Sequence, residues 1–212
     1  MRGPVLMCLL TAGLCSTSGA QELTPTAPVP PRTVEITPTV GWRMGGGVES
    51  EDGEFDVESA TSFGVILDVR VRSDGVVELL YDRQSSDVVR RSSTGPDSTV
   101  TDIVIEYFQL GGAVEFGHKP NLKPFFALTL GAAHLDPSGD RDDEWHFAGV
   151  ATLGAKAYLG ERIGLRAQTR LWGTFLTEES QIFCSLPGVC VISASGKLFV
   201  QADFSGGLMF VF

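Results

Sequence analysis

Hydrophobic and polar side chains alternate along the last stretch of the chain, Gln201 to Phe212. One face carries apolar residues at every second position, namely Val200, Ala202, Phe204, Leu208, Phe210 and Phe212. The other face is mixed, with Gln201, Asp203, Ser205, Met209 and Val211. A period of two indicates a β-strand, because successive strand side chains point to opposite faces. Aromatic residues continue to the last position, where a soluble sandwich would place a frayed, polar end. The pattern favours a strand with one face in an apolar environment, and an ordinary sandwich strand is the alternative.

The same alternation recurs in seven earlier segments, which predicts an all-β chain with eight strands. The segments are Val34–Met44, Thr61–Arg70, Val77–Ser85, Ile103–Phe116, Pro124–His134, Phe147–Leu159 and Ile163–Phe175. In the fourth segment Glu106 shares a face with Phe108 and Leu110. Either that strand continues past the apolar region at its Glu106 end, or a β-bulge shifts the alternation.

The connections between these segments alternate between short and long. Short links join the second strand to the third, the fourth to the fifth (Gly117 to Lys123) and the sixth to the seventh (Gly160 to Arg162), and the others are long and polar. This layout, with an even strand count, predicts an eight-stranded antiparallel up-and-down transmembrane β-barrel over residues 34–212. A lipocalin also has eight strands, but its apolar face points inward around a ligand.

The first twenty residues are typical of a secretory signal peptide. Arg2 precedes an apolar run from Val5 to Leu14, and small residues at 18–20 predict cleavage before Gln21. A lipoprotein signal using Cys15 is the alternative, although Leu14 stands where that signal normally has a small residue. Residues 21–33 contain four prolines and predict an extended leader. We therefore expect an exported protein of the bacterial outer membrane.

Composition indicates how many domains the chain forms and whether its cysteines are oxidised. A chain of 212 residues with a net charge of −10 suits one domain. It has no run of eighteen apolar residues, but a barrel needs only about ten residues per spanning strand. Once the signal is removed, Cys184 and Cys190 remain, and export to an oxidising compartment predicts a local disulfide between them. A zinc site would need further ligands, and all three histidines lie far away in sequence.

Charged residues of both signs fall on the predicted inward faces of the strands. They are Arg43, Asp68, Glu78, Asp82, Glu115, Lys156, Arg166, Arg170 and Asp203. Because eight strands enclose little more than their own side chains, we expect a network of ion pairs that fills the lumen. The alternatives are a hydrophilic pore, as in a minor porin-like channel, and a carboxylate pair for acid-base chemistry.

Two of the long connections are acidic. The segment from Gly47 to Ser59 holds six acidic residues and no basic one, and the segment from Asp136 to Glu144 has a single Arg141. A solvated acidic surface is the simplest interpretation. The alternative interpretation is weak binding of divalent cations or of a basic partner. Asp140, Asp142 and Asp143, however, lack the spacing of a calcium loop.

Together, the signal peptide, the strand pattern, the Gly111-Gly112 pair and the terminal Phe212 resemble the OmpA-like and OmpX-like family of small eight-stranded outer-membrane barrels. The resemblance covers about residues 34–212, and we expect no periplasmic peptidoglycan-binding domain of the kind found in full-length OmpA-type proteins. It implies contact with outer-membrane lipid and lipopolysaccharide. It also implies recognition by the barrel-assembly machinery of an aromatic terminal strand, here Phe204, Leu208, Phe210 and Phe212. Members of the family act as adhesins, structural proteins, minor channels and occasionally enzymes.

The candidates for catalysis are sparse. Lipid A enzymes of this barrel type use a histidine with a serine or an acidic partner, and here His134 and His146 flank the third long connection, with Ser138 near His134. The His-x-Ser-Asn arrangement used by the lipid A deacylase of this barrel type is absent. The sequence also has no nucleophile elbow, no phosphate-binding glycine loop and no basic patch for nucleic acid. We expect a structural or surface-interaction role without catalysis, cofactor or metal. A lipid A enzyme and a soluble periplasmic binding barrel are the alternatives.

Overall fold

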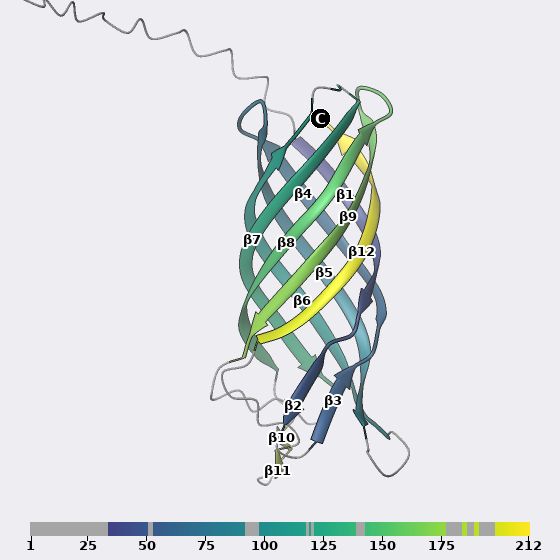
Figure 1. Ribbon diagram of the computed structural model, residues 1–212, viewed down its shortest axis with the longest axis vertical. Helices are drawn as coiled ribbons and strands as arrows, with labels where there is room; N and C mark the ends of the chain where they lie inside the picture. Colours follow the sequence, from purple (N-terminus) through teal and green to yellow (C-terminus); the bar gives the residue numbers. More distant parts are fainter. Residues whose placement is uncertain are drawn as a thin grey trace, which may run out of the picture.

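The protein forms a closed β-barrel in a computed structural model (Figure 1). The structure describes residues 34–50, 53–91, 98–117, 119, 121–138, 143–176, 184–185, 189–190 and 198–212. The predicted signal peptide and leader, at residues 1–20 and 21–33, lie outside this part. So do His118, Asp140, Arg141 and Asp142. Among the described residues, no helix has the length and apolar character needed to cross a membrane.

Eight long strands make up the wall of the barrel. They are β1 (Val34–Met44), β4 (Ala60–Arg70), β5 (Gly75–Arg91), β6 (Ser98–Glu115), β7 (Leu122–Pro137), β8 (Glu144–Tyr158), β9 (Ile163–Phe175) and β12 (Leu198–Val211). Each pairs antiparallel with the next in the chain, and β12 pairs with β1. The backbone N–H of Phe212 donates to the carbonyl of Val34 over 2.8 Å at the closing edge. The predicted eight-stranded up-and-down fold is confirmed.

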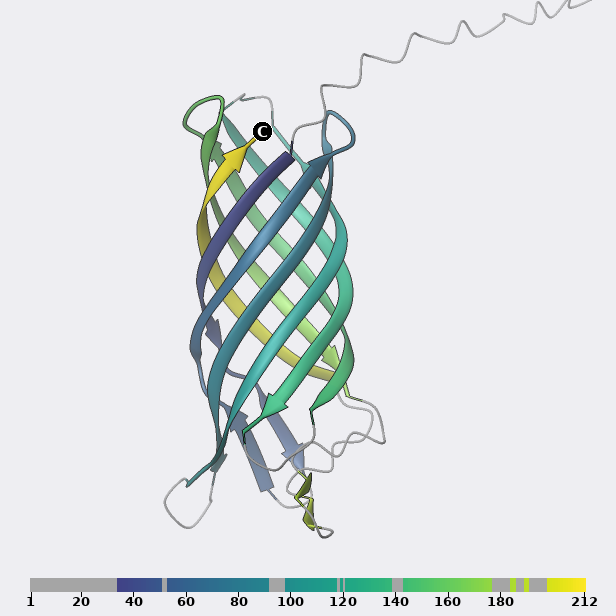
Figure 2. The same cartoon turned by 180° about the vertical axis from the view of Figure 1, so that it is seen from behind.

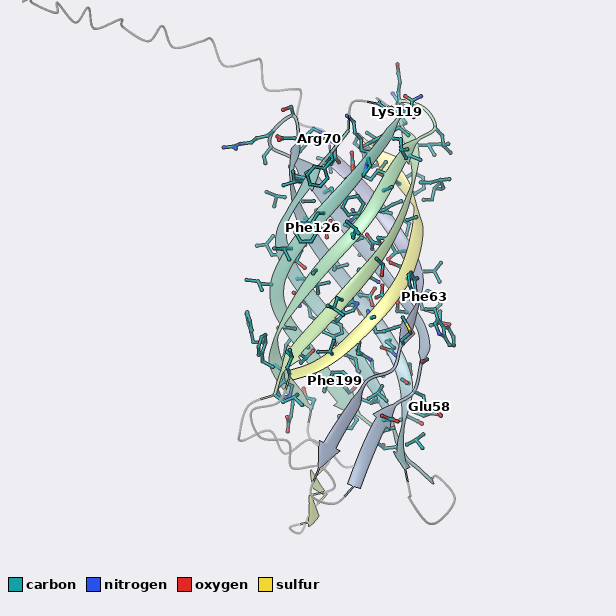
Figure 3. All side chains as sticks on the ribbon, viewed as in Figure 1. Glu58, Phe63, Arg70, Lys119, Phe126 and Phe199 are labelled. Atoms are coloured by element: carbon teal, nitrogen blue, oxygen red, sulfur yellow. The ribbon has the colours of Figure 1, made fainter. Side chains whose placement is uncertain are left out.

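The outer wall is apolar and the interior is largely polar. Strand β9 shows a strict alternation of exposed and buried residues, and the other wall strands follow it. Phe63 is 63% exposed and projects outward, as Figure 3 shows, while neighbouring Ser62 is fully buried. This arrangement is the reverse of a lipocalin, in which the apolar faces line the interior.

Aromatic side chains ring the outer wall at both ends. The ring at the long-loop end contains Trp42, Phe63, Tyr81, Phe108, Trp145, Phe147 and Phe175, and the ring at the short-turn end contains Phe116, Phe210 and Phe212. The 13 residues of β9 run the length of the apolar wall between them. At about 3.3 Å per residue and a tilt of about 40°, they span about 30 Å along the barrel axis, which is the thickness of a bilayer core.

The strands extend further at the loop end than the alternation predicted. Strands β5 and β6 remain paired out to Arg90 and Ser98, past a register shift at Val88/Val89. Within the predicted first loop, β2 (Gly47–Ser50) and β3 (Gly53–Val57) form a hairpin, and β3 pairs with β5. A small sheet therefore projects beyond the barrel (Figures 1 and 2). Polar and apolar residues do alternate over residues 54–57, but the stretch is short and lies within an acidic segment, so it did not stand out as a strand.

The two alternatives for Glu106 are resolved in favour of a continuous strand. Burial alternates without interruption from Ile103 to Phe116, so no bulge lies at Glu106 and its side chain is on the outer face. Glu106 lies two residues from Phe108 on the same face, on the loop side of the aromatic ring.

The short turns lie at the end where the chain finishes, opposite the projecting sheet (Figure 2). Gly117, in the β6–β7 turn, has a φ of 90°, which only glycine adopts without strain. At the loop end, β10 (Cys184–Ser185) and β11 (Val189–Cys190) form a two-residue ladder in which the backbones of Cys184 and Cys190 are register partners. Their side chains are outside the described structure, so the disulfide stays a prediction.

Candidate functional site

The structure places all nine predicted lumen charges inside the barrel. Each is 7% exposed or less, and Arg43, Asp82, Lys156 and Asp203 are fully buried. Ion pairs join them into two clusters, one toward the short turns and one toward the long loops.

The cluster near the short turns is built around Lys156 of β8. Its Nζ lies 2.6 Å from Glu35 Oε2 and 2.7 Å from Asp68 Oδ2. Glu115 is 3.1 Å away, at ion-pair distance but outside hydrogen-bond geometry. One buried ammonium group therefore holds three carboxylates that come from β1, β4 and β6.

Arg166 of β9 extends this cluster toward the middle of the barrel. It donates from Nη1 to Asp68 over 2.8 Å and from Nη2 to Glu78 over 2.7 Å. Its guanidinium also stacks 4.3 Å from the ring centre of Phe125, a cation–π contact. Gly154, the register partner of Phe125, leaves room for the ring, since a Cβ there would lie 2.7 Å from Phe125 Cζ.

Three members of this cluster were missing from the predicted network. Arg70 lies 2.9 Å from Glu115 and 3.5 Å from Glu35, and the Tyr158 hydroxyl donates to Glu35 over 2.8 Å. The alternation does place Glu35, Arg70 and Tyr158 on inward faces. They stand at strand ends, where the sequence alone does not show whether a side chain lies inside the barrel or beyond its rim.

The cluster near the loops is built around two carboxylates. Asp203 accepts from Arg170 Nε at 2.9 Å and from Trp172 Nε1 at 2.7 Å. Asp82 pairs with Arg170 over 2.8 Å and also with Arg43. The guanidinium of Arg43 lies 4.2 Å from the ring centre of Trp172, so the aromatic side chain covers the cluster on its loop side.

Beyond Trp172, apolar residues fill the loop end of the lumen. They include Leu80, Val88, Ile103, Ile105, Tyr107, Leu135, Val150, Leu176 and Phe199. Arg43, Asp82 and Asp203 have no accessible surface beneath this layer. A water-filled pore would expose these charges, so the interior is packed as a plug.

The predicted catalytic candidates do not come together. His134 is the register partner of Trp145, whose side chain is exposed, whereas His146 pairs with Ala133 and points inward. The two histidines are therefore on opposite faces of the wall. Ser138 is four residues beyond His134 in an extended segment, about 13 Å along the chain. Its backbone N–H donates to the carbonyl of Asp102.

On the outer wall, His134 belongs to a polar cluster at the loop end. Its Nε2 lies 2.8 Å from Asp143 Oδ2 and its Nδ1 lies 3.3 Å from Glu106 Oε2. The Tyr81 hydroxyl donates to the other oxygen of Glu106 over 2.6 Å. The ring of Trp145 stacks on His134 with centroids 4.5 Å apart.

This geometry favours the doubly protonated ring of His134. Each nitrogen faces a carboxylate oxygen, and only imidazolium can donate from both. The hydrogen bond from His134 lowers the pKa of the Asp143 carboxyl, which lies outside the strands. With no free lone pair, the ring is not placed to act as a general base. Within the part of the chain that the structure describes, no group of three or more His, Cys, Asp or Glu is arranged to hold a metal ion.

Comparison with known proteins finds similarity in structure but not in sequence. No protein-family model matches the sequence, and no curated protein sequence matches it. Neisserial surface protein A superposes with a TM-score of 0.56 and 12% identity, over 84% of this chain and 96% of that one. The outer membrane protein OprG from Pseudomonas aeruginosa superposes with a TM-score of 0.54 and 14% identity, over 85% and 95%. The chain has the fold of the small eight-stranded outer-membrane β-barrels.

In this outer-membrane barrel fold, the predicted assembly residues of β12 share the outer face. Phe204, Leu208, Phe210 and Phe212 are all exposed, and Phe212 is 74% exposed at the short-turn end. Met209 is fully buried and Val211 half-buried, so the predicted inside and outside of this strand are confirmed. Recognition of the strand by the assembly machinery remains a prediction.

Proposed function

We propose that this protein is an exported, integral outer-membrane barrel with a structural or surface-interaction role. The observation that carries the proposal is the lumen, in which buried ion pairs and an apolar layer leave Arg43, Asp82 and Asp203 without contact to water. A barrel filled in this way offers neither a conducting path nor an internal active site. Its contacts with other molecules are then made by the outer wall and the loop end.

The outer wall supports the membrane location. Large apolar side chains cover it between the aromatic rings at its two ends, and such rings mark the two interfaces of membrane barrels. The wall would contact outer-membrane lipid and lipopolysaccharide, after insertion by the barrel-assembly machinery.

The loop end supports the interaction role. The projecting sheet includes β2 and β3, which belong to the acidic segment, and it extends beyond the barrel on the side away from the short turns. A surface partner that recognises it would be basic or would bring divalent cations.

Two measurements test the proposal. Folded membrane barrels resist detergent until boiled, so the protein should migrate differently on a gel before and after heating. Recovery in the soluble periplasmic fraction, with no heat-dependent shift, would contradict the membrane location. In planar bilayers the purified protein should give no stepwise conductance. Steady single-channel steps would instead favour the minor porin-like channel.

A further inference from the structure

Arg83 is an exposed cation on the outer wall at the loop end of β5. Its register partners are Phe63 on β4 and Glu106 on β6, and all three side chains are on the outer face. Within the described structure Arg83 makes no ion pair, although Glu106 is its cross-strand neighbour.

Both carboxylate oxygens of Glu106 make their hydrogen bonds to groups other than Arg83. Oε1 accepts from the Tyr81 hydroxyl over 2.6 Å, and Oε2 faces His134 Nδ1 over 3.3 Å. His134 carries the charge that balances Glu106, and Asp143 holds the far side of its ring. Arg83 acts on Glu106 through its charge but donates no hydrogen bond within the described structure, so its N–H donors are available to an external anion.

Its height on the wall suggests which anion is present there. Tyr81, two residues earlier on the same face, belongs to the aromatic ring at the loop end. Aromatic rings of membrane proteins sit at the level of the lipid headgroups. Two strand residues on a tilted strand raise Arg83 about 5 Å above Tyr81, into the layer of headgroup phosphates.

We propose that Arg83 binds a phosphate group on the headgroup of an outer-leaflet lipid of the lipid A type. The planar guanidinium matches two phosphate oxygens with two parallel N–H donors. The next outward acid on β5 is Asp87, four residues and about 13 Å further along the strand. That distance exceeds the Debye length of about 8 Å at physiological salt, so the acidic loop end repels the phosphate only weakly.

The test uses the full chain, refolded in detergent, and native mass spectrometry of bound lipid. The two probes are a bisphosphorylated lipid A and the same lipid with its phosphates removed. We expect a preference for the phosphorylated form of about fivefold, equivalent to about 1 kcal/mol. Arg83→Gln should abolish the preference and Arg83→Lys should retain part of it. Arg72→Gln is the matched control, because Arg72 is exposed in a turn at the opposite end.

An unchanged preference in Arg83→Gln, or an equal loss in Arg72→Gln, would overturn the proposal. Displacement of the lipid by millimolar inorganic phosphate would also overturn it, because the site would then take a free anion and not a headgroup. The inference rests on the proposed membrane location. Lipid binding is measured on refolded protein in micelles, and the membrane location is tested separately by fractionation and heat shift. A negative binding result would therefore overturn the Arg83 proposal without affecting the membrane location.

Discussion

Replacing Lys156 with methionine tests whether the ion-pair network stabilises the barrel. The change keeps the length of the side chain but leaves Glu35, Asp68 and Glu115 without the ammonium group that lies 2.6 to 3.1 Å from each. Removing one partner from a buried ion pair costs about 3–5 kcal/mol. Arg70 and Arg166 still contact these carboxylates, which places the expected loss toward the lower end, about 3 kcal/mol.

Urea unfolding of the detergent-refolded protein, followed by tryptophan fluorescence, measures this loss. Lys123→Met is the matched control, since Lys123 is the register partner of Lys156 but is only half-buried. Its ammonium group donates to the Gly117 carbonyl over a long 3.4 Å. The control should lose less than about 1 kcal/mol.

One result would refute this reasoning. Equal losses of stability in Lys156→Met and Lys123→Met would mean that the buried ion pairs of Lys156 add nothing to the effect of replacing a lysine.

The remaining predictions concern the loop-side cluster, the outer wall and the last strand. Trp172→Phe keeps the ring over the cluster but removes the 2.7 Å bond to Asp203, so urea unfolding should show a loss of about 1.5–3 kcal/mol. His134→Ala should leave the lipid A composition of cells unchanged by mass spectrometry, and a loss of acyl modification in this variant would establish an enzyme. Deleting Phe212 should reduce surface-exposed barrel, measured by protease shaving of the loops, far more than Val211→Ala. Equal assembly of these two variants would remove the role of the terminal aromatic residue.

The period of two was sufficient to predict the barrel and its inward charges. Which face a side chain takes depends only on its place in its own strand, so Lys156, Arg166 and Asp203 could be placed inside without any knowledge of their partners. The short and long connections similarly limited the topology to neighbouring strands. The projecting sheet was missed, because β2 and β3 are short strands within an acidic segment and are positioned by pairing with β5.

Only the tertiary structure decided which residues meet. Lys156 reaches Glu35 across 121 positions, and Arg43 reaches Asp203 across 160, because closure of the tilted strands brings distant positions to one level of the lumen. The cluster around His134 illustrates the same limit. The alternation within β7 is enough to place His134 on the outer face, but only the register with β6 and β8 brings it beside Glu106 and Trp145. Such contacts depend on how neighbouring strands pair, which the periodicity of a single strand does not contain.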